Sequence, residues 1–284
     1  MYRVLADTLQ PYADATIRYF EKQHGVVSVQ IETEVDPDVS FRPTFHGKLP
    51  DKHLLCVEVS ETPLPPGIHE FIIQARNQNL PARLWVVIPK GILPAVDVKA
   101  LGFLRDNGVG LMEIEDARKT TVLSGPPLSI SLTGLRQFRI TEFPGKYRDG
   151  IRLAIDTFRN GNPAKGCSEL YDIIESLTRK LAAKASKIPG GVRHPLNMDL
   201  AKANWLPLLE ALRKEIDRQT LGCPNLTVQL FNRLIALTEY RNDTGHKPKN
   251  LEQLRIRDRQ LRTRFESACD ELQNLIRASA PLRL

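Results

Sequence analysis

The sequence predicts an α/β domain followed by an all-α domain, and three observations support this prediction. Helical and strand patterns alternate over residues 1–116, whereas only helical periodicity is present from residue 148 onward. A length of 284 residues suits two domains, each able to bury its own core. The charge also divides, because residues 1–135 hold 13 Lys/Arg against 16 Asp/Glu and residues 136–284 hold 27 against 17. The basic second part indicates a polyanionic partner, with nucleic acid as the first candidate.

The first part is predicted to follow the order α-β-β-α-β-α-β. Gly25 separates an apolar-periodic helix from the alternating, β-branched run VVSVQIETEV, which is typical of a strand. The run RLWVVIPK is apolar almost throughout, so we expect a strand buried on both faces. This alternation predicts a mixed or parallel sheet covered by helices. The expected strands are residues 26–35, 53–61, 83–90 and 109–116, and the expected helices are residues 4–23, 67–79 and 96–108.

Two stretches of this part carry a resemblance to a known family. RPTFHG (residues 42–47) precedes LLCVEVSE (residues 54–61), and with the element order they resemble the PD-(D/E)XK restriction-endonuclease-like family over roughly residues 1–116. The resemblance implies an acid after the proline and an acid-x-lysine motif on the next strand, which together hold a divalent metal. Here Thr44 replaces the acid, Ser60 replaces the lysine, and Glu58 remains. We therefore expect a nuclease-like domain without metal or nuclease activity, in which Glu58 is vestigial.

Two alternatives stay open for this domain. A nearby acid, namely Glu32, Glu34, Asp36 or Asp38, could replace the lost ligand and restore a metal-dependent DNA endonuclease that uses Glu58. Glu58 could instead be an ordinary acid at the end of a strand in an unrelated α/β module. If the resemblance holds, the remaining task of the domain is to recognise DNA, another ligand or a protein.

Residues 117–147 break both periodicities with clusters of Ser, Thr, Gly and Pro, so we assign them to a linker. Residues 148–284 then form the predicted helical domain. Asn250 with Gln253 three residues later has the arrangement of a capping box and opens the last helix. Helices of this length joined by short loops predict an antiparallel bundle. The expected helices are residues 148–160, 167–186, 203–219, 225–243 and 251–279.

The connection before the last helix, YRNDTGHKPK, holds an arginine, an asparagine and a histidine around one turn. Arg241 and His246 project from neighbouring backbone, so both can approach one phosphate group. RNA suits such a pair because its 2′-hydroxyl is an internal nucleophile. Cleavage then requires proton transfer, which histidine supplies, and a cation for the developing charge, which arginine supplies. Asn242 could orient the histidine or the phosphate through its amide.

This Arg-Asn-x-x-x-His spacing resembles the Rx4-6H signature of HEPN domains, and the resemblance covers about residues 148–278. It implies a four- to five-helix bundle that dimerises so that two Arg/His pairs face one cleft. In many members it also implies metal-independent endoribonuclease activity in toxin or antiphage systems. The signature is complete in Arg241, Asn242 and His246. The other interpretation is that Arg241 offsets the helix dipole, Gly245 ends the helix and His246 is an exposed turn residue.

Cations near this signature predict further phosphate contacts, each sensitive to salt. The alternative for the arginine-rich part of the last helix is an ordinary solvated face. No aromatic stripe accompanies it, so we expect little readout of RNA sequence. The residues assigned to RNA binding are Lys247, Lys249, Arg255, Arg259 and Arg262, and Arg257 and Arg264 belong to the same row.

Several functional classes are disfavoured by what the sequence lacks. Its four cysteines are far apart, and no Cys/His group has the spacing of metal ligands. No glycine-rich phosphate loop follows a predicted strand, so we expect neither a nucleotide fold nor a cofactor. No apolar run reaches the 18 or so residues of a membrane span, and the N-terminus has no signal-peptide pattern. We therefore expect a cytoplasmic protein without a membrane partner.

The combined prediction is a homodimeric, metal-independent endoribonuclease of toxin or antiphage type. Its helical domain would cleave RNA, and its α/β domain would act as a sensor or regulatory module. Two other functions remain open at this stage. One is a non-catalytic dimer that binds nucleic acid or a nucleotide, and the other is the metal-dependent DNA endonuclease that uses Glu58.

Overall fold

The structure is a computed structural model. It describes residues 7–91, 98–125, 128–136, 138–185, 202–218, 225–242 and 248–282, except for the side chains of residues 185, 240–242 and 282. The chain divides into two compact units. Unit 1 comprises Met1–Leu135, Arg159–Gly161 and Lys247–Gln260, and unit 2 comprises Arg136–Phe158, Asn162–His246 and Leu261–Leu284.

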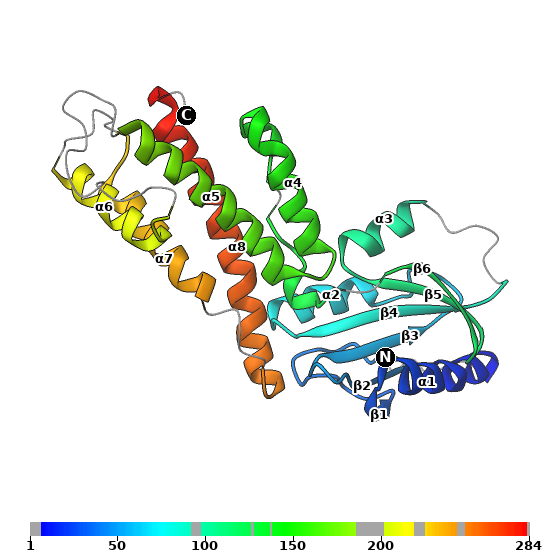
Figure 1. Cartoon of the computed structure of the whole chain (residues 1–284). Helices are drawn as coiled ribbons and strands as arrows, with labels where there is room; N and C mark the ends of the chain where they lie inside the picture. The colour runs from blue at the N-terminus through cyan, green and yellow to red at the C-terminus, as the bar shows by residue number, and fades with distance from the viewer. Residues whose placement is uncertain are drawn as a thin grey trace. The chain divides into compact units, whose positions relative to one another are not determined.

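Unit 1 contains a six-stranded mixed sheet with the strands in sequence order, β1 to β6 (Figure 1). β3, β4 and β5 are parallel because a helix connects each of them to the next, whereas the other neighbours are antiparallel. The strands are β1 (Val27–Ile31), β2 (Phe45–Lys48), β3 (Leu54–Val59), β4 (Ala82–Pro89), β5 (Gly110–Asp116) and β6 (Lys119–Ser124). The helices are α1 (Gln10–His24), α2 (Ile68–Asn77) and α3 (Val98–Asp106), with 3-10 turns at Asp7–Leu9 and Ile130–Leu132.

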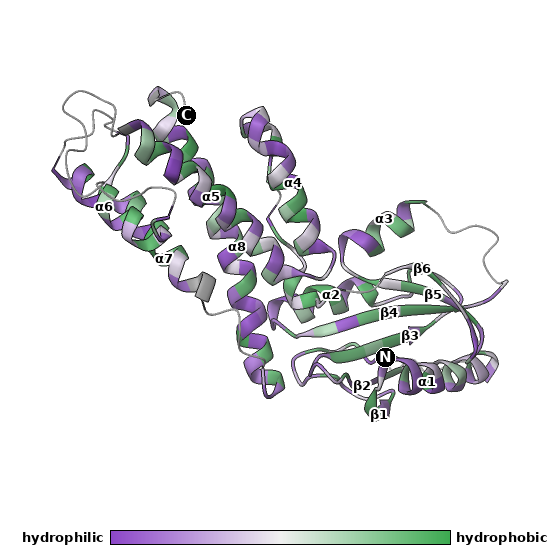
Figure 2. Cartoon of the chain, in the orientation of Figure 1, coloured by the Kyte–Doolittle hydropathy of each residue, from purple (hydrophilic) through white to green (hydrophobic). Residues whose placement is uncertain are grey.

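The sheet buries both of its faces. Alternate residues of β3 point in opposite directions, so Leu55 and Val57 join the core against α1 while Leu54 and Cys56 join the core that includes α2. Figure 1 shows α1 on one side of the sheet and α2 on the other. β3 and β4 are hydrophobic along most of their length (Figure 2). The prediction of a doubly buried strand is confirmed for β4, in which every residue but Arg83 is buried.

Two strands were not predicted from the sequence. β2 has only four residues and contains Gly47, which leaves too little alternation to indicate a strand. β6 is polar, mostly exposed and at the edge of the sheet, and it lies within residues 117–147, which we expected to be a linker. β1 is also shorter than the predicted strand of residues 26–35. The observed order of unit 1 is therefore α-β-β-β-α-β-α-β-β.

Unit 2 is helical, as the periodicity predicted. Its core joins helices that are distant in sequence, since Phe158 of α4 lies 4.5 Å from Phe265 of α8 between ring centroids. Trp205 of α6 donates a hydrogen bond from its indole N–H to Thr178 of α5. None of the helices in the described ranges combines the length and apolarity needed to cross a bilayer. The helices are α4 (Gly145–Arg159), α5 (Pro163–Ala185), α6 (Trp205–Asp217), α7 (Val228–Asn242) and α8 (Leu251–Ser279), of which α8 contributes its residues up to Gln260 to unit 1.

Candidate functional site

The Arg-Asn pair of the signature occupies the end of α7. This helix ends at Asn242 and α8 begins at Leu251, so Arg241 and Asn242 form the last turn before the connection. The predicted position at a helix junction is therefore confirmed for the backbone of these two residues. Their side chains, and the whole of His246 and Lys247, lie outside the described residues.

The cations assigned to RNA binding lie in different surroundings. Lys249 and Arg259 are exposed, and Arg262 is partly exposed. Arg255 is only 28% exposed and has a partner within unit 1, because its Nη2 lies 2.9 Å from Oδ2 of Asp36. Its Nη1 also lies 3.8 Å from Glu252 one turn earlier. Arg255 thus attaches the beginning of α8 to the loop after β1, a contact that the sequence pattern did not predict.

The two positions of the nuclease-like motif meet in space. Thr44 directly precedes β2, and Glu58 lies on β3, its antiparallel neighbour. The carboxylate Oε2 of Glu58 accepts hydrogen bonds from the backbone N–H of Thr44 at 3.0 Å and from its hydroxyl at 3.2 Å. The Thr44 hydroxyl oxygen in turn accepts a hydrogen bond from Val59 N–H at 3.0 Å. A threonine therefore binds the carboxylate at the position where the resemblance would place a second acid.

The acids that could replace the lost metal ligand beside Glu58 do not gather around it in one group. Asp36 pairs with Arg255, and Glu34 pairs with Arg42 at 2.5 Å. Glu32 lies near the motif, since it lines a cavity of about 170 Å³ together with Thr44. Within the described residues, no group of three His, Cys, Asp or Glu side chains has the arrangement of a metal site. Other lining residues of the cavity are Asp7, Gln10, Ala13, Ile17 and Ile31.

A buried polar cluster in unit 1 was not predicted from the sequence. It surrounds Asp258 of α8, which is 3% exposed. Its Oδ2 accepts hydrogen bonds from the hydroxyls of Ser129 at 2.7 Å and Ser131 at 2.5 Å. His53 Nε2 lies 3.8 Å from the same oxygen. We call Asp258, Ser129, Ser131, His53 and its neighbour Asp51 the Asp258 cluster.

Charge within the Asp258 cluster shifts the pKa of its titratable groups. Burial acts to lower the pKa of His53, but hydrogen bonds to Asp258 and Asp51 outweigh burial and raise it. Burial acts to raise the pKa of Asp51, but the hydrogen bond from His53 and the charge of Arg83 hold it well below its usual range. The Nδ1 of His53 lies 3.1 Å from Asp51, and Arg83 Nη2 lies 2.6 Å from the same carboxylate. Because Ser129 and Ser131 are almost fully buried, the cluster suits an attachment of α8 better than a site for substrate.

The described cysteines are buried and free, which agrees with a structural role. Cys56 and Cys269 pack in the cores, and burial raises the pKa of both thiols. Burial likewise raises the pKa of Cys167 to about 12. Cys223 lies outside the described residues. A thiol with a raised pKa is a poor nucleophile at neutral pH, so these three cysteines are unsuited to catalysis.

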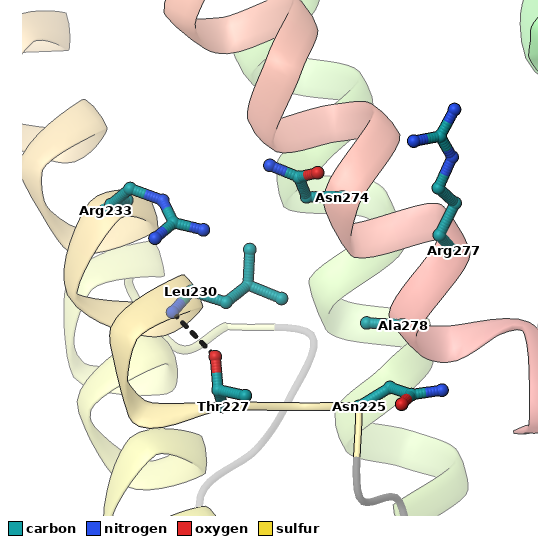
Figure 3. A pocket seen from close by; sticks show the side chains of 7 residues that line it. All are labelled: Asn225, Thr227, Leu230, Arg233, Asn274, Arg277 and Ala278. Carbon is teal, nitrogen blue, oxygen red and sulfur yellow. Dashed lines mark hydrogen bonds between the residues drawn. The ribbon is translucent and has the colours of Figure 1, made fainter.

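Unit 2 has a cavity of about 270 Å³ between α7 and α8 (Figure 3). Figure 3 shows Arg233 reaching from α7 toward α8, with Asn274 facing it. At the start of α7, the Thr227 hydroxyl oxygen accepts a hydrogen bond from Leu230 N–H at 3.2 Å. The lining residues are Asn225, Thr227, Leu230, Arg233, Asn274, Arg277 and Ala278.

Comparisons of the chain with models of protein families, with curated proteins and with solved structures gave no match. Both family resemblances therefore depend on the motif residues of the chain and on their positions in its fold.

Proposed function

We propose that the protein is a metal-independent endoribonuclease whose helical unit cleaves RNA with Arg241 and His246. The observation that carries this proposal is that Arg241 and Asn242 form the last turn of α7, directly before the connection that contains His246. This is the place in a helical bundle where the HEPN resemblance requires the signature. The basic second part of the sequence supports a polyanionic substrate.

In the proposed reaction, His246 takes the proton of the 2′-hydroxyl, and the resulting oxygen attacks the adjacent phosphorus to form a 2′,3′-cyclic phosphate. The bond from phosphorus to the 5′-oxygen breaks, and the leaving 5′-oxygen takes a proton from solvent. Arg241 donates two parallel hydrogen bonds to the phosphate oxygens and stabilises the charge that develops there. Asn242 orients the histidine or the phosphate. The resemblance further implies a homodimer in which two such pairs face one cleft, in a toxin or antiphage setting.

For unit 1 we propose a nuclease-like fold that has lost the metal-binding acids and serves as a sensor or regulatory module. The contact between Thr44, directly before β2, and Glu58 of the neighbouring strand β3 supports the resemblance, since the family motif spans those two positions. The donors around Glu58 support the loss of the metal, because a hydroxyl cannot replace a carboxylate as a strong ligand. A second candidate function, a DNA endonuclease that uses Glu58, is favoured by one observation, namely that Glu32 lines the same cavity as Thr44.

A cleavage assay in excess EDTA tests the proposal. Wild-type protein should cleave a mixed RNA substrate, and Arg241→Ala and His246→Ala should each lower the rate by about 100-fold or more. The matched controls are Arg152→Ala on α4, whose side chain is 58% exposed, and His69→Ala at an exposed position of α2. Both controls should keep the wild-type rate.

Four outcomes would contradict one or another part of this proposal. A folded His246→Ala protein with the full RNase rate would remove the proposed chemistry. Absence of RNA cleavage by the wild type would leave the binding dimer as the better reading. Cleavage of DNA that requires Mg²⁺ and is lost in Glu58→Gln would favour the DNA endonuclease instead. A monomer in light scattering at assay concentration would exclude the shared cleft.

A further inference from the structure

The cavity of unit 2 is lined largely by groups that donate hydrogen bonds. Its lining residues include two arginines, two asparagines and one threonine, and none of its described lining residues carries a carboxylate. Figure 3 shows Arg233 directed toward the cavity and the guanidinium of Arg277 directed away from it. Leu230 and Ala278 add apolar surface and are 3% and 6% exposed. A site with many donors, no lining anion and an apolar part suits a small ligand that is negatively charged at one end.

A carboxylate behind the cavity holds two of these donors in place. Glu271 is largely buried, and its Oε1 accepts a hydrogen bond from Arg233 Nε at 2.7 Å. Its Oε2 accepts a longer one from the Asn274 amide at 3.4 Å. Among the described residues, the side chain of Arg233 donates one hydrogen bond, from Nε to Glu271. Its two Nη groups therefore remain able to donate to a ligand. The guanidinium of Arg233 is therefore oriented before any ligand arrives.

Arg277 lies on α8 one turn after Asn274. Its side chain is 65% exposed, and its Nη2 is 3.5 Å from Oε2 of Glu142. That oxygen also accepts a hydrogen bond from Gln273 at 2.7 Å, so Glu142 keeps a partner if Arg277 moves. An exposed ion pair of this length contributes little, and an anion in the cavity can compete for the arginine.

We propose that this cavity binds the phosphate group of a small phosphate monoester, about the size of a mononucleotide. Arg233 supplies parallel Nη–H donors that fit two phosphate oxygens. Arg277 supplies a second positive charge once it leaves Glu142 and turns toward the cavity. Asn225, Asn274 and Thr227 contribute amide and hydroxyl donors, while Leu230 and Ala278 contact the carbon framework. A volume of about 270 Å³ accommodates a ligand of this size.

This inference goes beyond the proposed function and does not depend on it. The lining residues belong to the segment directly before α7, to the first two turns of α7 and to the last turns of α8. The Arg-Asn pair of the signature belongs to the last turn of α7. Loss of RNA cleavage in the assay above would leave the cavity unaffected. Absence of ligand binding would in turn leave the endoribonuclease proposal intact.

Calorimetric titration of the full chain with inorganic phosphate, AMP and adenosine tests the inference. AMP and phosphate should bind saturably, and adenosine should bind at least about tenfold more weakly than AMP because it lacks the charged group. Arg277→Gln and Arg233→Lys should each weaken AMP binding by about tenfold. The lysine keeps a positive charge opposite Glu271 but cannot present two parallel donors. Arg152→Gln removes a similarly exposed charge from α4 and should bind AMP as the wild type does.

Equal binding of adenosine and AMP would overturn the role of the phosphate. Absence of saturable binding by all three compounds at millimolar concentration would overturn the site itself. An equal loss of affinity in Arg277→Gln and Arg152→Gln would show that AMP responds to net charge and would also overturn the proposal. A tenfold loss confined to the two cavity variants would support it.

Discussion

His53 contributes stability that depends on pH. Its pKa in the folded protein is raised by Asp258 and Asp51, so the folded state holds the proton more tightly than the unfolded chain. The stabilisation is fully present below the ordinary histidine pKa of about 6.5 and is lost as pH rises through the folded pKa. We therefore expect the free energy of unfolding to contain a part that falls as pH increases above about 6.5.

Urea unfolding of the wild type and of His53→Gln at pH 6, 7, 8 and 9 measures this part. The variant should be less stable by about 1–3 kcal/mol at pH 6, because the buried carboxylate of Asp258 and the exposed carboxylate of Asp51 lose a charged partner. The difference should shrink as pH rises. The difference between the two proteins is the quantity to compare, since burial lowers the pKa of His24 and His46 in both of them. A difference that grows with pH would contradict a raised pKa for His53.

At the scale of elements, the first residues of α8 are attached to unit 1 by polar and apolar contacts. Leu251 packs against the core that includes α2, Leu254 is buried, and Asp258 forms the centre of its cluster. Asp258→Ala would leave two buried hydroxyls without the carboxylate that they donate to and would remove one of the two carboxylates beside His53. We expect it to destabilise unit 1 by about 3–5 kcal/mol.

Hydrogen exchange of the peptide covering residues 251–260 shows whether the attachment is lost. This peptide should exchange much faster in Asp258→Ala than in the wild type. Glu252→Ala is the matched control, because it removes a carboxylate from the same helix at a position that is 68% exposed. It should change stability by less than about 0.5 kcal/mol. Unchanged protection in Asp258→Ala would mean that the apolar contacts alone hold the beginning of α8.

Prediction of elements succeeded where a segment carried its own pattern. The apolar run of β4 and the helical periodicity of α4 to α8 are local properties, and all of these elements are present. The expected cap of α8 is also present, since Asn250 Oδ1 accepts a hydrogen bond from Gln253 N–H at 2.9 Å. The second bond of the capping box differs by one residue, because the Gln253 side chain accepts from the N–H of Lys249 and not from that of Asn250. β2 and β6 were missed because pairing with longer neighbours, rather than their own composition, makes them strands.

At the scale of the whole molecule, the uneven charge predicts RNA binding that depends on salt. For single strands, the logarithm of the binding constant falls with the logarithm of salt concentration by about 0.7 for each neutralised phosphate. Lys249 is exposed, so Lys249→Gln should reduce this slope by about 0.7. Arg255→Gln should leave the slope unchanged, because Arg255 already pairs with Asp36.

Binding of the inactive His246→Ala protein to a short RNA at 50–300 mM salt, followed by fluorescence anisotropy, provides the slopes. Arg105→Gln on α3, with a side chain that is 79% exposed, controls for the loss of one surface charge. It should leave the slope as in the wild type. A larger change in the slope for Arg255→Gln than for Lys249→Gln would contradict the assignment of Arg255 to the attachment of α8.

The sequence by itself determined the α/β and helical classes, the division of charge and the candidate signature in Arg241, Asn242 and His246. These are properties of composition, periodicity and spacing, and each can be read within a short window. Only the tertiary structure decided that Thr44 binds Glu58, that Arg255 pairs with Asp36, and that Ser129, His53 and Asp258 form one cluster. These partners are 14 to more than 200 residues apart in the sequence. A pattern within a short window therefore cannot predict which of these side chains come into contact in the fold.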